Sequence, residues 1–411
     1  MTLRLSPKEN NKNWIRIKLS GSKSISNRVL IINAIADNCH PIVNLADCDD
    51  TNSMLNILNS NANEFDVGHA GTTMRFLTAY LSGMYGEWMI TGSKRMQQRP
   101  IALLVDALKE LGADIEYLAN EGYPPLKISG RKLVSKEIEI KGDVSSQYIS
   151  ALLMIAPRVA GGLTIKLQGQ VMSIPYIDMT LRLMQDFGVK CYRNNNVLSV
   201  EEGAYSPRPF VVEGDWSSAS YWFSIVALSE RDFEVELSPL FKDSLQGDSE
   251  IAKIFELLGV ETKWRDDENL VITKARMPIA NKLVLDLRKT PDIAQTIAVC
   301  ACALDVPFEF TGLETLKIKE TDRITALIDE LAKCGYCLEA PVHGSLRWAG
   351  KKLQAEKVPR VSTYHDHRMA MAFAPLGLVR EIEIEDEGVV SKSYENFWID
   401  LHPLVNQKKL N

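Results

Sequence analysis

The sequence lacks the features that mark membrane and secreted proteins. Among its 411 residues, no apolar run approaches the roughly 18 residues that a membrane-spanning helix needs. Residues 1–23 contain no apolar core of the kind that a signal peptide has. We therefore expect a cytoplasmic protein that has no membrane partner.

Cysteine is scarce, and its distribution does not suggest cross-links. The seven cysteines are an odd number, and Cys300 and Cys302 lie inside an apolar run. Reduced thiols are therefore expected rather than a disulfide framework. Cys334 and Cys337 have the spacing of a redox or metal pair, but they fall where a helix is expected to end and a strand to begin, which argues against that role.

Metal ligands and excess positive charge are also missing. His365 and His367 could be two metal ligands, but no second cluster of ligand residues accompanies them. The net charge of −6 argues against general binding of nucleic acid, so any concentration of Lys and Arg must be local and directed at a small anion. We expect no metal, no organic cofactor and no nucleic-acid partner.

The chain does contain a long internal repeat. Its length suggests two or three domains, and a composition of 45% hydrophobic and 24% charged residues is typical of globular proteins. Six times a short polar segment precedes an apolar one, most plainly at 142–147 and 214–218. The six segments begin at Gly21, Gly68, Gly142, Gly214, Arg288 and His365, in steps of 47, 74, 72, 74 and 77 residues. Such a period indicates one supersecondary unit copied along the chain.

Each copy is predicted to contain a strand, a helix, a strand, a second helix and a hairpin. The first helix is apolar nearly all round and should be buried, whereas the second carries charges and should lie outside. The second helices should stop at glycines, namely Gly112, Gly188, Gly259 and Gly335. Alternating segments at 126–128 and 138–140, and at 270–272 and 283–286, are interpreted as paired strands. The first step is about 27 residues short, so the first copy is predicted to lack its hairpin.

Cations gather at the predicted helix starts. The backbone N–H groups of a helix start favour anions, and Ser145 or Ser146 is the predicted N-cap of one of them. Cations are disfavoured there, yet they recur at Lys23, Arg28, Arg75, Arg99, Lys319, Arg323 and Arg368. We interpret the set as a site for a polyanionic ligand; the alternative is that each cation is solvated or paired with a nearby acid. Residues 319–323 could likewise be a surface charge run.

In these residues the chain resembles the 5-enolpyruvylshikimate-3-phosphate synthase family over essentially its whole length. The matching motifs are residues 21–28, 70–75, 98–100, 142–147, 319–323 and 366–370. The resemblance implies a two-domain inverse α/β barrel built from six repeated βαβαββ-type units, three per domain, with buried helices surrounded by sheets. Residues 1–21 and 214–411 would form a discontinuous domain, and residues 22–213 an inserted domain whose first unit is truncated.

The resemblance also implies an activity. The enolpyruvyl (1-carboxyvinyl) group of phosphoenolpyruvate would pass to the 5-hydroxyl of shikimate 3-phosphate by addition and elimination, giving 5-enolpyruvylshikimate 3-phosphate and phosphate. This is a step of the shikimate pathway toward chorismate and the aromatic amino acids. The family expectation is a monomer.

Site residues follow from the resemblance, position by position. Shikimate 3-phosphate would be bound by Lys23, Ser24, Arg28, Ser145, Ser146, Gln147, Ser173, Tyr176, Asp292 and Lys319. Phosphoenolpyruvate would be bound by Lys23, Gly71, Arg99, Gln147, Arg323, Arg368 and Lys392. The expected catalytic residues are Asp292, acting on the 5-hydroxyl, and Glu320 with Lys23, acting on the carbon proton.

Three positions depart from the common family pattern, and two other functions compete. The departures are His69, Phe76 and Thr315. UDP-N-acetylglucosamine enolpyruvyl transferases are similar in architecture, but they usually have Lys-Asn at the first helix start and a catalytic cysteine in the first half. Here Ser24 follows Lys23, and no cysteine lies between residues 48 and 191. The other competitor is an anion-binding scaffold without catalysis, against which the joint presence of Asp292, Glu320 and Lys23 argues.

Overall fold

The computed structural model describes residues 1–9, 13–37, 40–142, 145–230, 233–275 and 279–410. Asp143 and Val144, which belong to the motif at 142–147, lie outside the described residues. The chain forms two compact units. Unit 1 comprises Met1–Ser20 and Glu213–Asn411, and unit 2 comprises Gly21–Val212.

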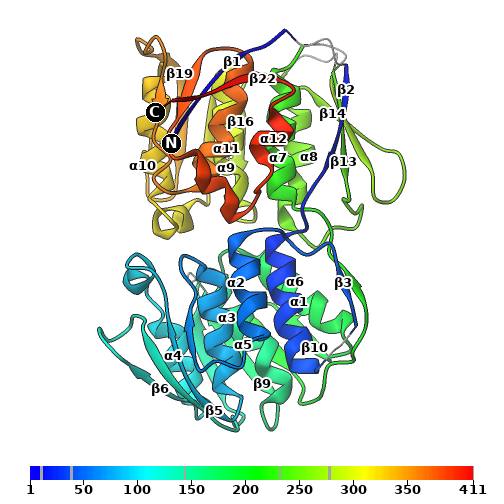
Figure 1. Ribbon diagram of the computed structural model, residues 1–411, viewed down its shortest axis with the longest axis vertical. Coiled ribbons are helices and arrows are strands. Elements are labelled where there is room, and N and C mark those ends of the chain that lie inside the picture. Colours follow the sequence, from blue (N-terminus) through cyan, green and yellow to red (C-terminus); the bar gives the residue numbers. More distant parts are fainter. Residues whose placement is uncertain (10–12, 38–39, 143–144, 231–232, 276–278, 411) are drawn as a thin grey trace. The chain divides into compact units, whose positions relative to one another are not determined.

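Unit 2 contains six α-helices within its described residues, of two kinds that alternate along the chain (Figure 1). The helices are α1 (Lys23–Ala36), α2 (Asp49–Leu58), α3 (Gly71–Ser82), α4 (Ala102–Glu110), α5 (Ser146–Ile155) and α6 (Ile174–Asp186), with 3-10 turns at Met96–Gln98 and Ala156–Arg158. The strands are β3 (Ile42–Val43), β4 (Glu64–Asp66), β5 (Gly86–Thr91), β6 (Asp114–Tyr117), β7 (Leu126–Gly130), β8 (Glu137–Lys141), β9 (Leu163–Gln168), β10 (Cys191–Asn194), β11 (Val197–Val200) and β12 (Phe210–Val211).

Unit 1 repeats this alternation with its own helices. They are α7 (Trp216–Leu228), α8 (Ile251–Glu256), α9 (Ala294–Ala303), α10 (Arg323–Lys333), α11 (His367–Phe373) and α12 (Phe397–Leu401), with 3-10 turns at Gly247–Glu250, Pro291–Ile293, Glu314–Ile318, Ala374–Leu378 and Glu387–Lys392. The strands are β1 (Thr2–Pro7), β2 (Trp14–Lys18), β13 (Glu234–Ser238), β14 (Val260–Trp264), β15 (Leu270–Lys274), β16 (Leu283–Asp286), β17 (Phe308–Thr311), β18 (Tyr336–Glu339), β19 (Leu346–Lys352), β20 (Arg360–Val361), β21 (Ile382–Ile384) and β22 (Val405–Leu410).

The first helix of each copy forms the core of its unit. In unit 1, α7, α9 and α11 lie side by side (Figure 1) and contact one another. Every residue of α7 is buried. In unit 2, α1, α3 and α5 meet in the same way. The second helices each expose one face; α10, for example, buries only six of its 11 residues. The predicted architecture of buried helices surrounded by sheets is confirmed, because a helix that is apolar on all sides must be covered on all sides.

Five four-stranded sheets share one topology. In three of them the strands on either side of the first helix are parallel, and the hairpin after the second helix adds two antiparallel strands, as in the order β10-β11-β9-β8. In the other two, β2 takes the place of the strand before α7, and β1 together with β22 takes the place of the hairpin. The predicted pairing of 126–128 with 138–140 is wrong, because β7 pairs with β5 and β6 whereas β8 pairs with β9 in the next sheet. The predicted pairing of 270–272 with 283–286 is wrong for the same reason: β15 pairs with β13 and β14, and β16 with β17.

The sixth sheet is the truncated one. Its two described strands are β3 and β12, which are parallel, and α2 leads to β4 without a hairpin. The predicted loss of the hairpin from the first copy is therefore confirmed.

Glycines end the second helices where the sequence predicts. Gly112, Gly188, Gly259 and Gly335 have φ of 96°, 83°, 80° and 99°. A residue with a β-carbon is strained in this left-handed region, so glycine lets the chain leave the helix and turn into the hairpin.

The strand before a crossing between units belongs to the unit that the chain leaves. β2 precedes α1 in the sequence, yet it pairs in parallel with β13 of unit 1. β12 precedes α7, yet it pairs with β3 of unit 2. β1 is an inner strand of another unit 1 sheet, where it lies between β21 and β22. Residues near both ends of the chain are therefore needed to complete unit 1.

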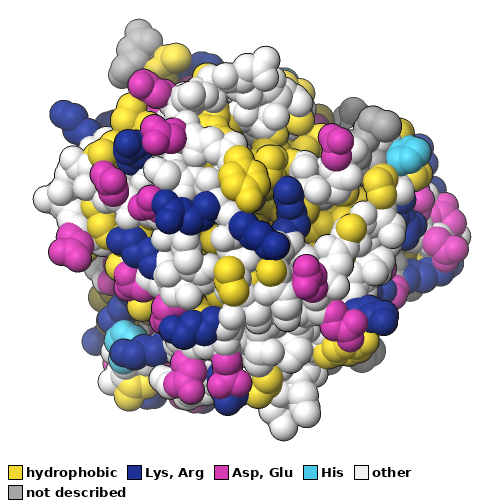
Figure 2. Space-filling model, turned by 90° about the horizontal axis from the view of Figure 1, so that it is seen from below, with side chains coloured by type: hydrophobic (Ala, Val, Ile, Leu, Met, Phe, Trp, Pro, Cys, Tyr) yellow, Lys and Arg dark blue, Asp and Glu magenta, His cyan; other side chains and the backbone are white. Residues whose placement is uncertain are grey.

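The surface carries mixed charge. On the face shown in Figure 2, Lys and Arg side chains are interspersed with Asp and Glu, and apolar side chains occur singly or in small groups. Within the described residues, no helix combines the length and the hydropathy that crossing a bilayer requires.

Candidate functional site

In unit 1, residues from several helix starts form one charged network, here called the Arg323 cluster. They come from the turn before α9, the start of α10, the start of α11 and the turn before α12. The cluster consists of Asp292, Lys319, Glu320, Arg323, Asp366, Arg368 and Lys392. Its three carboxylates face four cations, which leaves one formal positive charge in excess. The structure thus brings together all the unit 1 residues that the sequence analysis assigned to the site.

Arg323 is the centre of this network. Its guanidinium donates from Nε to Asp366 Oδ2 at 2.7 Å, from Nη1 to Asp292 Oδ1 at 3.0 Å and from Nη2 to Glu320 Oε2 at 2.9 Å. Its side chain is only 2% exposed. Burial alone would lower the pKa of Arg323, but Asp366, Glu320 and Asp292 together raise the pKa above its ordinary value.

Asp292 has three cations around its carboxylate. Besides Arg323, Lys319 Nζ lies 3.6 Å from Oδ1, and Arg368 Nη2 lies 3.4 Å from Oδ2. Arg368 also donates from Nη1 to the backbone carbonyl of Asp292 at 3.1 Å. The carboxylate is thereby held in one orientation at the start of the apolar helix α9.

Glu320 forms the second acidic position of the cluster. It accepts from Arg323 through one oxygen, and its Oε1 accepts from Lys392 Nζ at 2.8 Å. Glu320 and Lys392 are 16% and 13% exposed, so the ion pair is partly accessible. Glu320 and Lys392 thus present a carboxylate and an ammonium group side by side.

Helix capping explains why these side chains are fixed. Asp366 is the N-cap of α11 and accepts from the backbone N–H of Arg368 at 2.9 Å while it binds Arg323. Asp322 caps α10, the helix that Arg323 begins.

Burial lowers the pKa of the Lys319 ammonium, although Asp292 acts in the opposite direction. A lysine with a lowered pKa gives up a proton more readily than a solvated one.

Asp248 lies close to the cluster, and the sequence analysis missed it. Its carboxyl is hydrogen-bonded to Ser217 Oγ at the start of α7, and its side chain is buried. Burial raises the pKa of Asp248 to about 7, the negative charge of Asp292 adds to this, and Arg368 opposes it. The repeat could have identified Asp248, because it lies at the start of a second helix, as do Arg99, Ser173 and Arg323 in other copies.

In unit 2, Arg28 is a buried cation with neutral partners. Within the described part of the chain it forms no ion pair. Its acceptors are the hydroxyls of Thr180 (2.7 Å) and Ser150 (3.0 Å) and the carbonyls of Ser24 (2.7 Å) and Tyr176 (3.4 Å). Burial lowers the pKa of Arg28 to about 10. Its Cζ also lies 5.4 Å from the ring centre of Phe76, one of the three departures from the family pattern.

Gly71 allows two arginines to approach the start of α3. A β-carbon placed on Gly71 would clash with Arg99 Nη1, lie 2.9 Å from Arg99 Cζ and lie 2.8 Å from Arg75 Nη1. Arg75 Nη1 also donates to the carbonyl of Gly71 at 2.7 Å. Because Gly71 has no side chain, the Arg99 guanidinium has room to lie against the start of α3.

Polar side chains complete the unit 2 group. Ser145 is the N-cap of α5 and accepts from the N–H of Gln147, as predicted for Ser145 or Ser146. The Gln147 amide donates to Thr72 at 3.1 Å. Ser173 occupies the N-cap position of α6 in the left-handed region, with φ of 55°, and its side chain forms no capping hydrogen bond.

Lys23 begins α1 and is paired across the unit. Its Nζ lies 3.8 Å from Oδ2 of Asp50, a buried acid at the start of α2 that the sequence analysis did not single out. Asp50, like Asp248, occupies the start of a second helix. Within the described residues, no group of three or more His, Cys, Asp and Glu side chains is arranged to hold a metal ion.

The fold and the site define an α/β protein in which cations and carboxylates gather at helix starts. Two solved structures of EPSP synthase from Acinetobacter baumannii share the fold, with TM-scores of 0.79 and 0.80 at 20% and 19% identity. One alignment covers 99% of this chain and 100% of the other, and the second covers 100% of both.

Sequence comparison gives the family. The family model described as EPSP synthase (3-phosphoshikimate 1-carboxyvinyltransferase) matches residues 14–62 and 58–401. A 3-phosphoshikimate 1-carboxyvinyltransferase from Bacteroides fragilis is 50% identical over 387 residues, 94% of each chain, and one from Vibrio atlanticus is 36% identical over 94% of this chain and 96% of its own. The chain belongs to the EPSP synthase family.

Asp248 should make folding stability depend on pH. The folded protein keeps the Asp248 proton up to about pH 7, whereas the unfolded chain loses it near pH 4. The folded state therefore binds more protons in this window, and the contribution of Asp248 to stability falls as pH rises through it. Between pH 5 and pH 7, we expect the free energy of unfolding of Asp248→Asn to rise by about 2 kcal/mol relative to that of the parent, measured by urea unfolding.

The control for this measurement is Asp267→Asn. Asp267 is 94% exposed, so its substitution should leave the pH dependence of the parent unchanged. Parallel stability curves for the parent and Asp248→Asn would show that Asp248 is not protonated in the folded state at neutral pH.

Proposed function

We propose that the protein transfers the enolpyruvyl group of phosphoenolpyruvate to the 5-hydroxyl of shikimate 3-phosphate, with release of phosphate. The observation that carries the proposal is the excess of positive charge at the assigned positions. Arg28 is buried without a carboxylate partner, and the Arg323 cluster holds four cations against three carboxylates. Two phosphorylated substrates repel each other, and fixed cations in a site of low dielectric constant offset that repulsion.

Shikimate 3-phosphate is assigned mainly to the unit 2 group. Ser145, Ser146 and Ser173 would bind its phosphate, because the hydroxyls and backbone N–H groups of two helix starts favour an anion. The other residues assigned to this substrate are Lys23, Ser24, Arg28, Gln147, Tyr176, Asp292 and Lys319. Arg28 would supply positive charge to this group, since its hydrogen-bond acceptors within unit 2 are all neutral.

Phosphoenolpyruvate is assigned to a second set of residues, most of them cations. Its residues would be Lys23, Gly71, Arg99, Gln147, Arg323, Arg368 and Lys392. Arg99 and Arg368 present planar guanidinium groups, which suit carboxylate and phosphate oxygens. Arg323 already donates to three carboxylates, so its contribution would be to orient Asp292 and Glu320 as well as to add charge.

The acid–base roles follow from the two carboxylates of the cluster. In the addition step Asp292 would take the proton of the 5-hydroxyl as its oxygen attacks C2 of phosphoenolpyruvate, and Glu320 or Lys23 would give a proton to C3. In the elimination step the bond from C2 to the phosphate oxygen breaks, a proton leaves the new methyl group, and the double bond forms again. No oxidant and no further reactant is needed.

We further propose that units 1 and 2 are the discontinuous and inserted domains of a monomeric enzyme. Its place would be the cytoplasm, because both substrates are phosphorylated metabolites. UDP-N-acetylglucosamine is a less suitable acceptor for this chain, which has Ser24 after Lys23 and no cysteine between residues 48 and 191.

Phosphate release tests the proposed reaction. With shikimate 3-phosphate and phosphoenolpyruvate together, we expect one phosphate per turnover and none when either is omitted, measured by a coupled phosphate assay. Replacing shikimate 3-phosphate by UDP-N-acetylglucosamine should give no release. Release only with the nucleotide sugar, or with neither acceptor, would contradict the proposal.

Asp292→Asn should separate binding from turnover. The amide keeps the shape of the side chain but cannot take a proton, so we expect kcat to fall by about 10² to 10⁴ while both substrates still bind measurably. Asp329→Asn, on the exposed face of α10, is the matched control and should be active. Near-normal turnover of Asp292→Asn would refute the assignment.

Gly71→Ala should weaken phosphoenolpyruvate binding specifically. The added methyl group meets the guanidinium groups of Arg99 and Arg75, so Arg99 must move. We expect KM for phosphoenolpyruvate to rise about tenfold, and KM for shikimate 3-phosphate to change little. Gly83→Ala is the control, because a β-carbon there lies 3.8 Å from its nearest neighbours. Equal changes in the two KM values would contradict the role of Arg99.

A further inference from the structure

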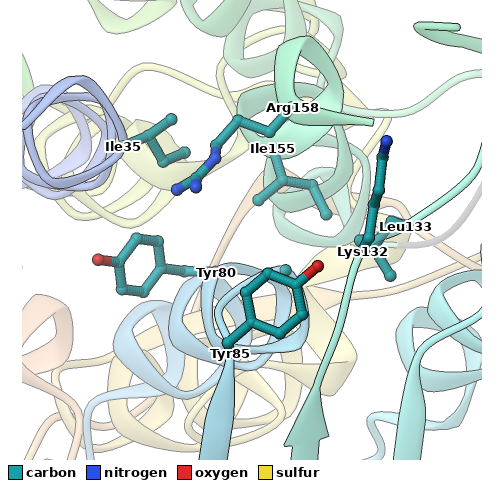
Figure 3. A pocket seen from close by; sticks show the side chains of 8 residues that line it. Ile35, Tyr80, Tyr85, Lys132, Leu133, Ile155 and Arg158 are labelled. Carbon is teal, nitrogen blue, oxygen red and sulfur yellow. The ribbon is translucent and has the colours of Figure 1, made fainter. Parts of the chain in front are cut away.

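A pocket lies in unit 2 at the opposite ends of the buried helices from the candidate site. Its lining includes Ile35 near the end of α1, Tyr80 near the end of α3, and Ile155 and Arg158 at the end of α5 (Figure 3). Tyr85 and Lys132, which follow α3 and β7 in the sequence, complete the wall. Lys23 and Ile35 are 12 residues apart on α1, so about 18 Å of helix separates the pocket from the substrate residues at the other end.

Two cations line this pocket, here called the Arg158 pocket, without a carboxylate partner. Arg158 Nη1 donates to the thioether of Met84 at 3.1 Å, and a thioether is a weak acceptor. Neither Arg158 nor Lys132 forms an ion pair among the residues that the structure describes. Both side chains are exposed, so water solvates them when the pocket is empty, and an anion in the pocket would take the place of that water beside two positive charges.

Neighbouring charges favour an anion as well. Burial raises the pKa of the Tyr80 hydroxyl, and Arg158 lowers it more than Asp37, the nearby acid, raises it. Of the two charges that act on the Tyr80 hydroxyl, Arg158 therefore has the larger effect on its pKa.

The remaining wall is apolar and aromatic. The rings of Tyr80 and Tyr85 and the side chains of Ile35 and Ile155 border the space beside Arg158 in Figure 3. The cavity volume is about 160 Å³. A cavity of about 150 Å³ holds one benzene ring, so the size fits a single aromatic ring. Inorganic phosphate would meet the cations but leave the apolar wall uncovered.

We infer that the Arg158 pocket is a binding site for a small aromatic carboxylate. The ring would pack between the tyrosine and isoleucine side chains, and the carboxylate would accept two hydrogen bonds from Arg158, with Lys132 adding charge. This site is separate from the one used in the proposed reaction.

The probe is 4-fluorobenzoate, followed by ¹⁹F NMR titration of the full chain. We expect saturable binding of one molecule per chain that phosphoenolpyruvate does not displace. The isosteric neutral compound 4-fluorobenzamide should bind at least about tenfold more weakly, because it cannot form charge-assisted hydrogen bonds.

Two variants locate the probe. Arg158→Gln should weaken 4-fluorobenzoate binding by about tenfold or more, whereas Arg193→Gln, which removes another unit 2 arginine, should not. Gly83→Leu should also abolish binding. A β-carbon at Gly83 has room at 3.8 Å from Leu133 and from the Tyr80 carbonyl, so the larger side chain can fill the pocket without displacing the backbone.

Three results would overturn the inference: no saturable binding, binding that phosphoenolpyruvate displaces, or binding that Arg158→Gln and Gly83→Leu leave unchanged. None of these results depends on phosphate release, so failure of the pocket and failure of the proposed reaction are distinguishable. The phosphate assay on Arg158→Gln and Gly83→Leu, expected to equal the parent, confirms that both variants fold.

Discussion

The charged groups of unit 1 depend on one buried cation. Arg323 binds Asp292, Glu320 and Asp366 at once, and these acids come from two consecutive copies of the repeat. Removing one partner from a buried ion network typically costs about 3 to 5 kcal/mol, because the remaining charges lose their compensation without regaining water. Arg323 therefore fixes the distance between two candidate acid–base groups, and it does so with a side chain too buried to move freely.

Unit 2 also contains a buried cation, but the groups around that cation are different. Arg28 is as buried as Arg323, but its partners are hydroxyls and carbonyls, so nothing within the unit cancels its charge. Burying a cation in this way lowers its pKa and costs stability that a bound anion would restore. One unit thus holds a network of charges that is largely compensated internally and that positions carboxylates. The other holds a buried charge that its own side chains leave uncompensated.

Some parts of this structure could be predicted from the sequence and others could not, because only some structural features leave a local pattern in the sequence. The apolar first helices and the glycines that end the second helices were predictable, since helical burial and left-handed turns leave local signatures. Strand partners were not, because an alternating segment such as β7 or β15 looks the same whichever neighbour it pairs with. Cations at the starts of both kinds of helix revealed most of the candidate site. Asp248 and Asp50 were missed because acidic residues are common at helix starts, where they interact favourably with the helix dipole. Only the position of these two residues in the repeat distinguishes them.

Because of the exchange of strands at the crossings, β13 and β3 each gain a parallel neighbour from the segment that leaves their unit. β2 and β12 could each have paired within the unit of the helix that comes after it in the sequence. Instead, β2 pairs with β13 of unit 1, and β12 pairs with β3 of unit 2. Unit 2 needs only residues 21–212, so its contacts close early in the chain. Unit 1 needs β1 and β2 to find strands more than 200 residues later. Such distant pairing is slow to form, and an inserted unit that folds first shortens the effective separation of the segments that must meet.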